Sequence, residues 1–332
     1  MTRASEPTVD AVTLPCRFCS AKNRIPVSRA LEDLTLVRCG KCGSGLLRVQ
    51  GEPLTDLSDD ALAHPWDREA LDKLKAIPLA DTVIQKVLGS TLDKLQHFDL
   101  MAGGVRVGPQ QAPRLWRLYL EAAGRIGVDP PPLFITQHPL ANAFTVGAGQ
   151  PQVGVTTGLL DLLDDRAILG VLGHELTHVR LGHVTYRTLV LLILRGALKL
   201  LDVFGLASLV VKPLQVALFR WYQMSELSAD RGELLTTGSL ETFVRTHMLL
   251  AGGSQRWASD LNVAAFVDQA HEAERLRDND LLLWAMELFN ANDRTHPLTV
   301  WRVHHGLKWA QTPAFFELLA GTPPDGLLGQ EG

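Results

Sequence analysis

One short run of residues, 173–178 (GHELTH), holds two histidines four positions apart, with a glutamate directly after the first. In a helix, residues four apart lie on one face, so the imidazoles of His174 and His178 can reach the same metal ion. Glu175 lies about 100° around the helix from His174, so it can reach a water on that ion without binding the ion itself. The HExxH pattern therefore predicts a zinc site in which Glu175 serves as the general base.

A catalytic zinc takes three protein ligands and leaves one position open, so a third ligand is expected elsewhere in the chain. Glu226 and Asp230 lie four apart in a run that is predicted to be helical. We predict that Glu226 binds the metal and that Asp230 accepts a hydrogen bond from the outer nitrogen of a ligand histidine. Small Ser228 and Ala229 would let this helix approach the first. Without HExxH, an acidic pair on a solvated helix face would be the preferred interpretation.

His183 is the competing candidate for the third ligand, since it follows His178 by five residues. A third histidine of the metzincin type would lie six residues after His178, and a glycine would lie three residues after His178. Neither position matches, and Gly182 is expected to end the helix. We interpret His183 as a structural histidine.

All four cysteines lie near the N-terminus, in two CxxC pairs with 19 residues between them: Cys16, Cys19, Cys39 and Cys42. This spacing predicts a zinc ribbon, with four thiolates in a closed structural site. Metal binding would drive the folding of so small a unit. Reactive or unpaired thiols are the alternative. Thiolates that must stay reduced favour a cytoplasmic location.

The secondary-structure elements predicted to position these residues are mostly helices, together with a small sheet. The predicted fold class is therefore α+β. Residues 161–182 form a strong helix candidate that Asp164 or Asp165 can cap and that Gly182 can end. Short β-branched runs predict strands at 133–136, 142–146 and 153–157, with another starting near 105–107. Helical patterns cover residues 66–100 with a break at Pro78, 113–125, and most of 185–320.

The charge and hydropathy of the chain limit the kinds of partner and location that are expected. A net charge of −4 without an acidic or basic tail gives no reason to expect a nucleic-acid partner. The polar N-terminus lacks the basic start and apolar run of a secretory signal. The most apolar region, residues 188–219, is interrupted by charges such as Arg195 and Asp202, so a membrane-spanning helix is not expected. Two amphipathic or buried helices are the preferred interpretation, and a membrane-peripheral hairpin is the alternative.

These motifs together resemble the gluzincin peptidases that include the bacterial HtpX-type heat-shock protease and the CAAX prenyl protease. HELTH and the later ELSAD carry the resemblance, which covers residues 66–320. Further matching segments are NAFT at 142–145, TTGLL at 156–160, the HxxxGH continuation at 178–183, and Thr295-His296-Pro297 followed by Arg302. The charged insert after the HxxxGH segment is similar to that of the soluble members. The cysteine-rich stretch resembles the zinc ribbon that precedes some bacterial thioredoxins, but no thioredoxin domain follows it.

The resemblance implies a zinc-dependent endopeptidase that acts on proteins or peptides, with a role in protein quality control. It implies one catalytic zinc on His174, His178 and Glu226, with Glu175 as the base. It further implies that His296 and Arg302 face the cleft and stabilise the oxyanion, although a turn histidine and a surface arginine are the alternatives. Asn142, Ala143 and Phe144 would border an extended substrate.

The expected organisation is a flexible N-terminus (1–15), a zinc ribbon (16–49), a linker (50–65), a zincin peptidase domain (66–320) and a flexible tail (321–332). The sequence is also compatible with two other functions. One is a chaperone-like or adaptor protein that cuts little, and the other is a protease associated with the cytoplasmic side of a membrane.

Overall fold

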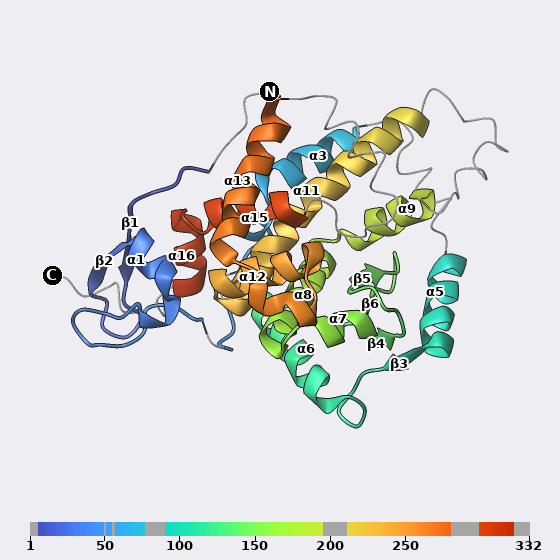
Figure 1. Ribbon diagram of the computed structural model, residues 1–332, viewed down its shortest axis with the longest axis horizontal. Coiled ribbons are helices and arrows are strands. Elements are labelled where there is room, and N and C mark those ends of the chain that lie inside the picture. The colour runs from blue at the N-terminus through green and yellow to red at the C-terminus, as the bar shows by residue number, and fades with distance from the viewer. Residues whose placement is uncertain are drawn as a thin grey trace.

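The computed structural model describes residues 6–49, 51–54, 57–76, 90–194, 211–279 and 299–321. Figure 1 shows a body of packed helices, with a small sheet on one side and the N-terminal module on the other. The predicted oxyanion residue His296, the tail from residue 322 onward and residues 195–210 of the apolar insert lie outside the described residues.

The helical body is consistent with the predicted α+β class. Its helices are α3 (Pro65–Lys75), α5 (Ser90–Gly103), α6 (Pro113–Ile126), α7 (Thr157–Leu162), α8 (Asp165–Arg180), α9 (Val184–Leu194), α11 (Val211–Thr237), α12 (Leu240–Gly252), α13 (Val263–Asn279), α15 (Thr299–Trp309) and α16 (Pro313–Ala320). Local sequence sets several of their ends. Helix α6 begins with Pro113 in its first turn and ends at Gly127, whose φ of 69° suits glycine.

The sheet of the body has the strand order β3-β4-β6-β5. Its strands are β3 (Gly104–Arg106), β4 (Leu133–Thr136), β5 (Ala143–Val146) and β6 (Gln152–Thr156). Strands β4 and β6 are parallel, whereas β3 and β5 pair antiparallel with their neighbours. The predicted strands are therefore confirmed to within one residue at their ends. Strand β5 is the last strand of this sheet, on the side of α8 and α9 (Figure 1).

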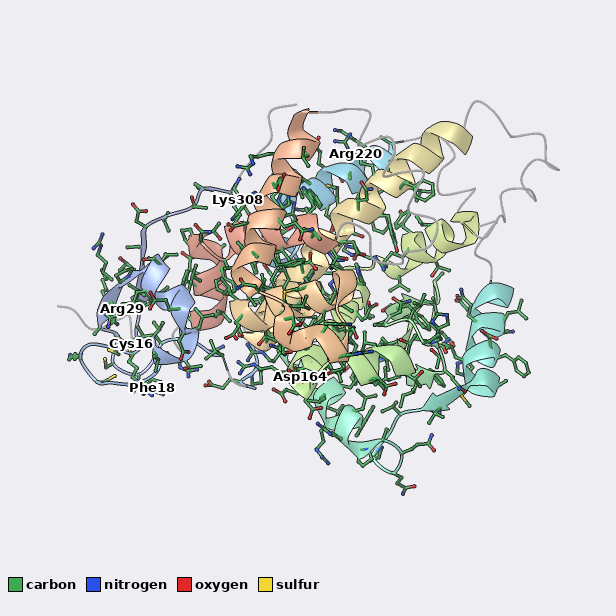
Figure 2. All side chains as sticks on the ribbon, viewed as in Figure 1. Cys16, Phe18, Arg29, Asp164, Arg220 and Lys308 are labelled. Atoms are coloured by element: carbon green, nitrogen blue, oxygen red, sulfur yellow. The ribbon has the colours of Figure 1, made fainter. Side chains whose placement is uncertain are left out.

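The helix predicted over residues 161–182 is two helices in the structure, so that prediction is corrected. Leu163 is extended, with φ −106° and ψ 146°, and it ends α7. Asp164 then caps α8 by accepting a hydrogen bond from the backbone N–H of Ala167, as predicted for this residue. Figure 2 labels Asp164 at the start of α8. At the other end, Gly182 adopts a φ of 68° and turns the chain toward α9.

Helices α8 and α11 pack against each other with almost no space between their backbones. A Cβ atom on Gly232 would lie 1.8 Å from Oγ1 of Thr177, and one on Gly173 would lie 2.2 Å from Oγ1 of Thr236. Only glycine permits so close a crossing. The small residue Ser228, predicted to serve this approach, instead bonds Asp67 of α3. The glycines therefore bring the two motif helices together.

The N-terminal module contains β1 (Ala11–Pro15), β2 (Lys22–Pro26), α1 (Val27–Glu32) and the short 3-10 helix η1 (Leu34–Leu36). Strand β1 pairs antiparallel with β2 and buries Val12 and Leu14. Residues 11–15, expected to be flexible, are thus an ordered part of the module, because their alternating apolar side chains fill its core.

The described residues of the segment predicted as a linker, 51–54 and 57–65, are packed against the body. The segment contains α2 (Asp59–Leu62), capped by Ser58, and buries Leu54 and Leu57. The buried guanidinium of Arg125 on α6 donates to the carbonyls of Arg48 and Glu52 on one side and of Leu235 on the other. This arginine ties the end of the cysteine module to α6 and α11. The core of the module is consequently continuous with that of the body.

Candidate metal centre

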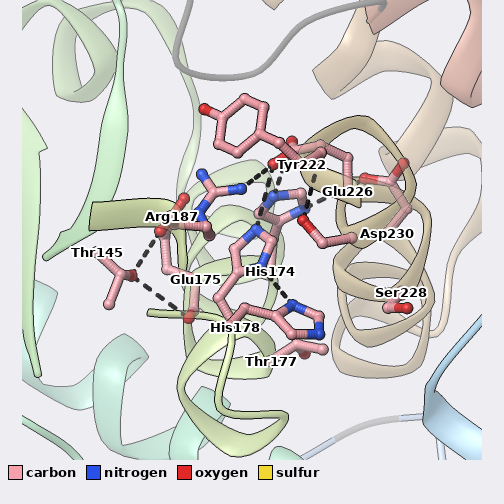
Figure 3. A network of polar contacts seen from close by, with 12 residues as sticks. Thr145, His174, Glu175, Thr177, His178, Arg187, Tyr222, Glu226, Ser228 and Asp230 are labelled. Atoms are coloured by element: carbon pink, nitrogen blue, oxygen red, sulfur yellow. Dashed lines mark hydrogen bonds and ion pairs between the residues drawn. The ribbon is translucent and has the colours of Figure 1, made fainter. Parts of the chain in front are cut away.

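Three side chains from two helices converge on one point between α8 and α11 (Figure 3). The candidate ligand atoms of His174, His178 and Glu226 all lie within 4.8 Å of one another. Nε2 of His174 is 3.5 Å from Oε2 of Glu226, and Nε2 of His178 is 3.4 Å from Oε1. Tetrahedral zinc, with bonds near 2.0–2.1 Å, separates its ligand atoms by about 3.3 Å. The residues present therefore fit a zinc ion in spacing and in donor chemistry.

The outer nitrogens of both histidines face further polar groups. Nδ1 of His174 lies 3.2 Å from Oδ1 of Asp230, which is the contact predicted for that carboxylate. Nδ1 of His178 lies 2.9 Å from Nδ1 of His183. His183 is thus placed outside the three-donor set, but its contact with His178 was not anticipated. Such outer partners hold the rings of metal-binding histidines in one orientation.

Glu175 is completely buried and is directed toward the sheet. Its Oε2 atom accepts a 2.6 Å hydrogen bond from Oγ1 of Thr145, in the outer strand β5 (Figure 3). Thr145 ends the NAFT segment at 142–145, and its contact with Glu175 was not predicted from the sequence. Because side chains alternate along a strand, Thr145 shares a face with Ala143 and faces away from Phe144.

The predicted substrate segment lies at the start of β5. The backbone N–H of Asn142 donates to Oγ1 of Thr156, and Ala143 is buried. The ring of Phe144 covers Gly154 of the neighbouring strand, where a Cβ atom would lie 2.2 Å from its Cζ. Phe144 therefore packs on the sheet, and Thr145 is the residue of this segment whose side chain reaches the metal centre.

Two buried arginines hold the carboxylates of the site. Arg302, from α15, donates from Nε to Oδ2 of Asp230 at 2.8 Å, and its Nη1 lies 2.9 Å from Oε2 of Glu226. Arg187, from α9, forms an ion pair with Oε1 of Glu226 and stacks 4.6 Å from the ring centroid of Tyr222. Arg302 is only 4% exposed and contacts both carboxylates. Arg187 was missed, although it follows His183 by four residues, at the start of the helix after the HxxxGH segment, which was a usable signal.

The charges around the site favour the protonation states that a metal requires. Burial would raise the pKa of Asp230, but the charge of Arg302 and the hydrogen bonds from Arg302, His174 and His247 together hold that pKa well below its usual value. Burial, and then the positive charge of Arg187, lower the pKa of His178 well below its usual value. An ionised carboxylate and a neutral imidazole are the forms that orient and bind zinc.

The four cysteines form a second cluster in the N-terminal module, where Figure 2 labels Cys16. The sulfurs of Cys16 and Cys42 are 3.6 Å apart, as are those of Cys19 and Cys39. Thiolates on tetrahedral zinc are about 3.8 Å apart, for Zn–S bonds near 2.3 Å. Backbone N–H groups, first that of Cys42, lower the pKa of Cys39 to about 6. The cluster therefore fits a metal site with four thiolate ligands.

Comparisons with known proteins agree on one family. The family model for peptidase family M48 matches residues 109–310. The chain is 30% identical over 266 residues to the plastoglobule-localized metallopeptidase 48 of Arabidopsis thaliana, covering 80% of this chain and 76% of that protein. It is 26% identical to a protease HtpX homolog of Ralstonia pickettii, covering 64% of this chain and 79% of that protein. No solved structure matches.

Proposed function

The chain belongs to peptidase family M48 and is a zinc-dependent metalloprotease; from this premise we propose that His174, His178 and Glu226 hold its catalytic zinc. The observation that carries the assignment is the spacing of the three donors, with 3.4 and 3.5 Å between imidazole and carboxylate atoms. Two residues come from one turn of α8, and the third comes from a helix held against it by glycine contacts.

When bound there, zinc lowers the pKa of a water ligand and polarises the scissile carbonyl. Glu175 accepts the proton of the attacking water and returns it to the leaving amine. Its buried position and the hydrogen bond from Thr145 keep one carboxylate oxygen in a defined direction. In this proposal the carboxylate of Glu175 carries the transferred proton.

His296 is the candidate that stabilises the oxyanion, on the basis of its Thr-His-Pro motif. Arg302 has a different role in this proposal, because its donors bond Asp230 and Glu226. It holds the carboxylate ligand and the outer carboxylate of His174 in place, and it balances their charge.

The family acts on proteins or peptides, and we place the substrate along β5. A chain in extended conformation can add to the outer strand of a sheet through backbone hydrogen bonds. The contact between Thr145 and Glu175 supports this location, because it joins the outer strand to the catalytic base. Recognition through the backbone implies weak sequence selectivity and a preference for flexible or unfolded segments, as protein quality control requires.

The four-cysteine cluster is proposed to hold a second, structural zinc. We propose that residues 16–49, together with strand β1 before them, form the ribbon and that residues 66–320 form the peptidase domain, with the packed segment between them as their connection. The reduced thiolates that such a site needs favour the cytoplasm. None of the helices in the described part of the chain combines the length and apolar character needed to cross a membrane.

The test pairs Glu175→Gln with His174→Ala in the full chain, using cleavage of casein or a fluorogenic peptide and elemental analysis. Glu175→Gln should keep wild-type zinc content and lose activity by about 10²–10⁴-fold. His174→Ala should lose one zinc. Glu241→Gln, at an exposed position on α12, is the matched control and should change neither quantity.

An active Glu175→Gln protein would refute the assignment of the base. A wild-type protein that binds zinc but cleaves nothing, with or without phenanthroline, would favour the adaptor function instead.

A further inference from the structure

Helix α3, which precedes the family-matched residues, contributes a carboxylate to the surroundings of the candidate metal centre. We propose that Asp67, acting through His183, positions the zinc ligand His178, and that the segment before the family-matched residues 109–310 is therefore part of the active enzyme. This inference rests on the proposed role of His178 as a ligand. Asp67 and His183 would be positioning residues, since neither reaches the ion.

The contacts form a continuous chain of buried groups. Nδ1 of His178 lies 2.9 Å from Nδ1 of His183, and Nε2 of His183 lies 3.0 Å from Oδ2 of Asp67. All three side chains are at most 3% exposed. Water is therefore excluded from these contacts, and each proton must lie between the two atoms that share it.

A zinc ion bound to His178 would fix which ring nitrogen of each histidine carries a proton. If Nε2 of His178 binds zinc, its Nδ1 must carry the proton and donate it to Nδ1 of His183. His183 then has its own proton on Nε2, which is the nitrogen that faces Asp67. One arrangement of protons thus satisfies every contact, and it ends on a carboxylate that can only accept.

Asp67 is itself held in a fixed position. Its Oδ2 atom accepts a 2.6 Å hydrogen bond from Oγ of Ser228, and Oγ of Ser228 accepts a 2.8 Å hydrogen bond from the backbone N–H of His64. Ser228 lies two residues after the proposed ligand Glu226 on α11. The same helix that supplies the third ligand therefore also fixes the carboxylate behind the second.

Each of the two proposed histidine ligands is therefore held by a carboxylate, one directly and the other through a second imidazole. His174 faces the carboxylate of Asp230 directly, at 3.2 Å. His178 reaches the carboxylate of Asp67 through one intervening imidazole. A carboxylate at the end of such a chain fixes the tautomer and raises the basicity of the ligand, and its removal typically weakens metal binding by 10–100-fold.

The experiment measures zinc affinity of the full chain by chelator competition, with zinc content from elemental analysis and folding from circular dichroism. Asp67→Asn should bind the catalytic zinc about 10–100-fold more weakly than the wild type. Asp72→Asn makes the same change at an exposed position of α3 and should leave the affinity unchanged. His178→Ala defines the zinc that remains at other sites.

A second pair of variants distinguishes positioning from general packing. His183→Asn keeps an acceptor oxygen near the position of Nδ1, whereas His183→Ala removes it. Asparagine should therefore retain more zinc affinity than alanine. In the zinc-loaded wild type, long-range ¹H–¹⁵N NMR should show His178 protonated on Nδ1 and His183 on Nε2, a result that needs no variant.

The outcomes separate the inference from the function it rests on. Wild-type zinc content in His178→Ala would overturn the proposed ligand set. If His178→Ala loses its zinc while a folded Asp67→Asn protein binds zinc like the wild type, only the role of Asp67 is overturned. A His183 ring protonated on Nδ1 would overturn the chain of contacts directly.

Discussion

The hydroxyl of Thr145 donates a 2.6 Å hydrogen bond to Oε2 of Glu175, across 30 residues of sequence, and joins the outer strand of the sheet to the helix that carries HExxH. The pair is buried, so the bond is not weakened by water. The strand proposed to bind substrate is thus hydrogen-bonded to the residue proposed to transfer protons.

Replacing Thr145 by valine keeps the shape of the side chain and removes this bond. A hydrogen bond to a charged group contributes about 1.5–3 kcal/mol, so kcat should fall by about 10–100-fold while zinc content stays unchanged. Steady-state kinetics on a fluorogenic peptide measure the effect. Thr145→Ser keeps the hydroxyl and should retain most of the activity; equal losses in both variants would contradict the role of the hydroxyl.

Arg302→Met tests whether this arginine holds the carboxylates of the site in place. The change leaves the buried Asp230 without its main cation and should lower the free energy of unfolding by about 3–5 kcal/mol. Urea denaturation monitored by circular dichroism measures it, with Arg245→Met at an exposed position of α12 as the control. Unchanged stability with a large loss of kcat would instead favour the oxyanion role expected from the sequence.

Removal of the cysteine site should affect one zinc only. The double variant Cys16→Ser with Cys19→Ser should bind one zinc per chain in place of two and should expose residues 6–49 to limited proteolysis, because metal binding stabilises so small a unit. His178→Ala should also bind one zinc but keep the module resistant. Loss of both ions from either variant would show that the two sites depend on each other.

The acid stability of the chain should depend on Glu274 of α13. Burial would raise its pKa, but hydrogen bonds from His305 and Trp301 lower it from 4.5 to about 2. A lowered folded pKa adds stability that is complete above pH 4.5 and is lost as the pH falls toward 2.

Glu274→Gln should therefore lower the free energy of unfolding by about 1–3 kcal/mol at neutral pH. Its difference from the wild type should disappear near pH 2. Glu272→Gln, exposed on the same helix, is the control. Denaturation at a series of pH values measures the difference, and a gap that does not narrow in acid would contradict the pKa shift.

Local spacing was enough to predict the groups that can bind metal. His174 and His178 share a helix face, Glu226 and Asp230 share another, and the two CxxC pairs each close a short turn. Helix and turn geometry fix the relative positions of residues a few places apart, so these sets could be recognised before any fold was known. The strands and the capped start of α8 were predictable for the same reason.

The partners of those groups depended on contacts between distant segments. Thr145 meets Glu175, Arg302 meets Asp230 across 72 residues, and Ser228 meets Asp67 across 161. No local pattern encodes such pairs, because they arise only after α8 and α11 cross at Gly173 and Gly232 and the other elements pack around them. The sequence by itself determined which residues can hold a metal; the tertiary structure decided which neighbours orient and charge-balance them, since burial and long-range packing exist only in the folded chain.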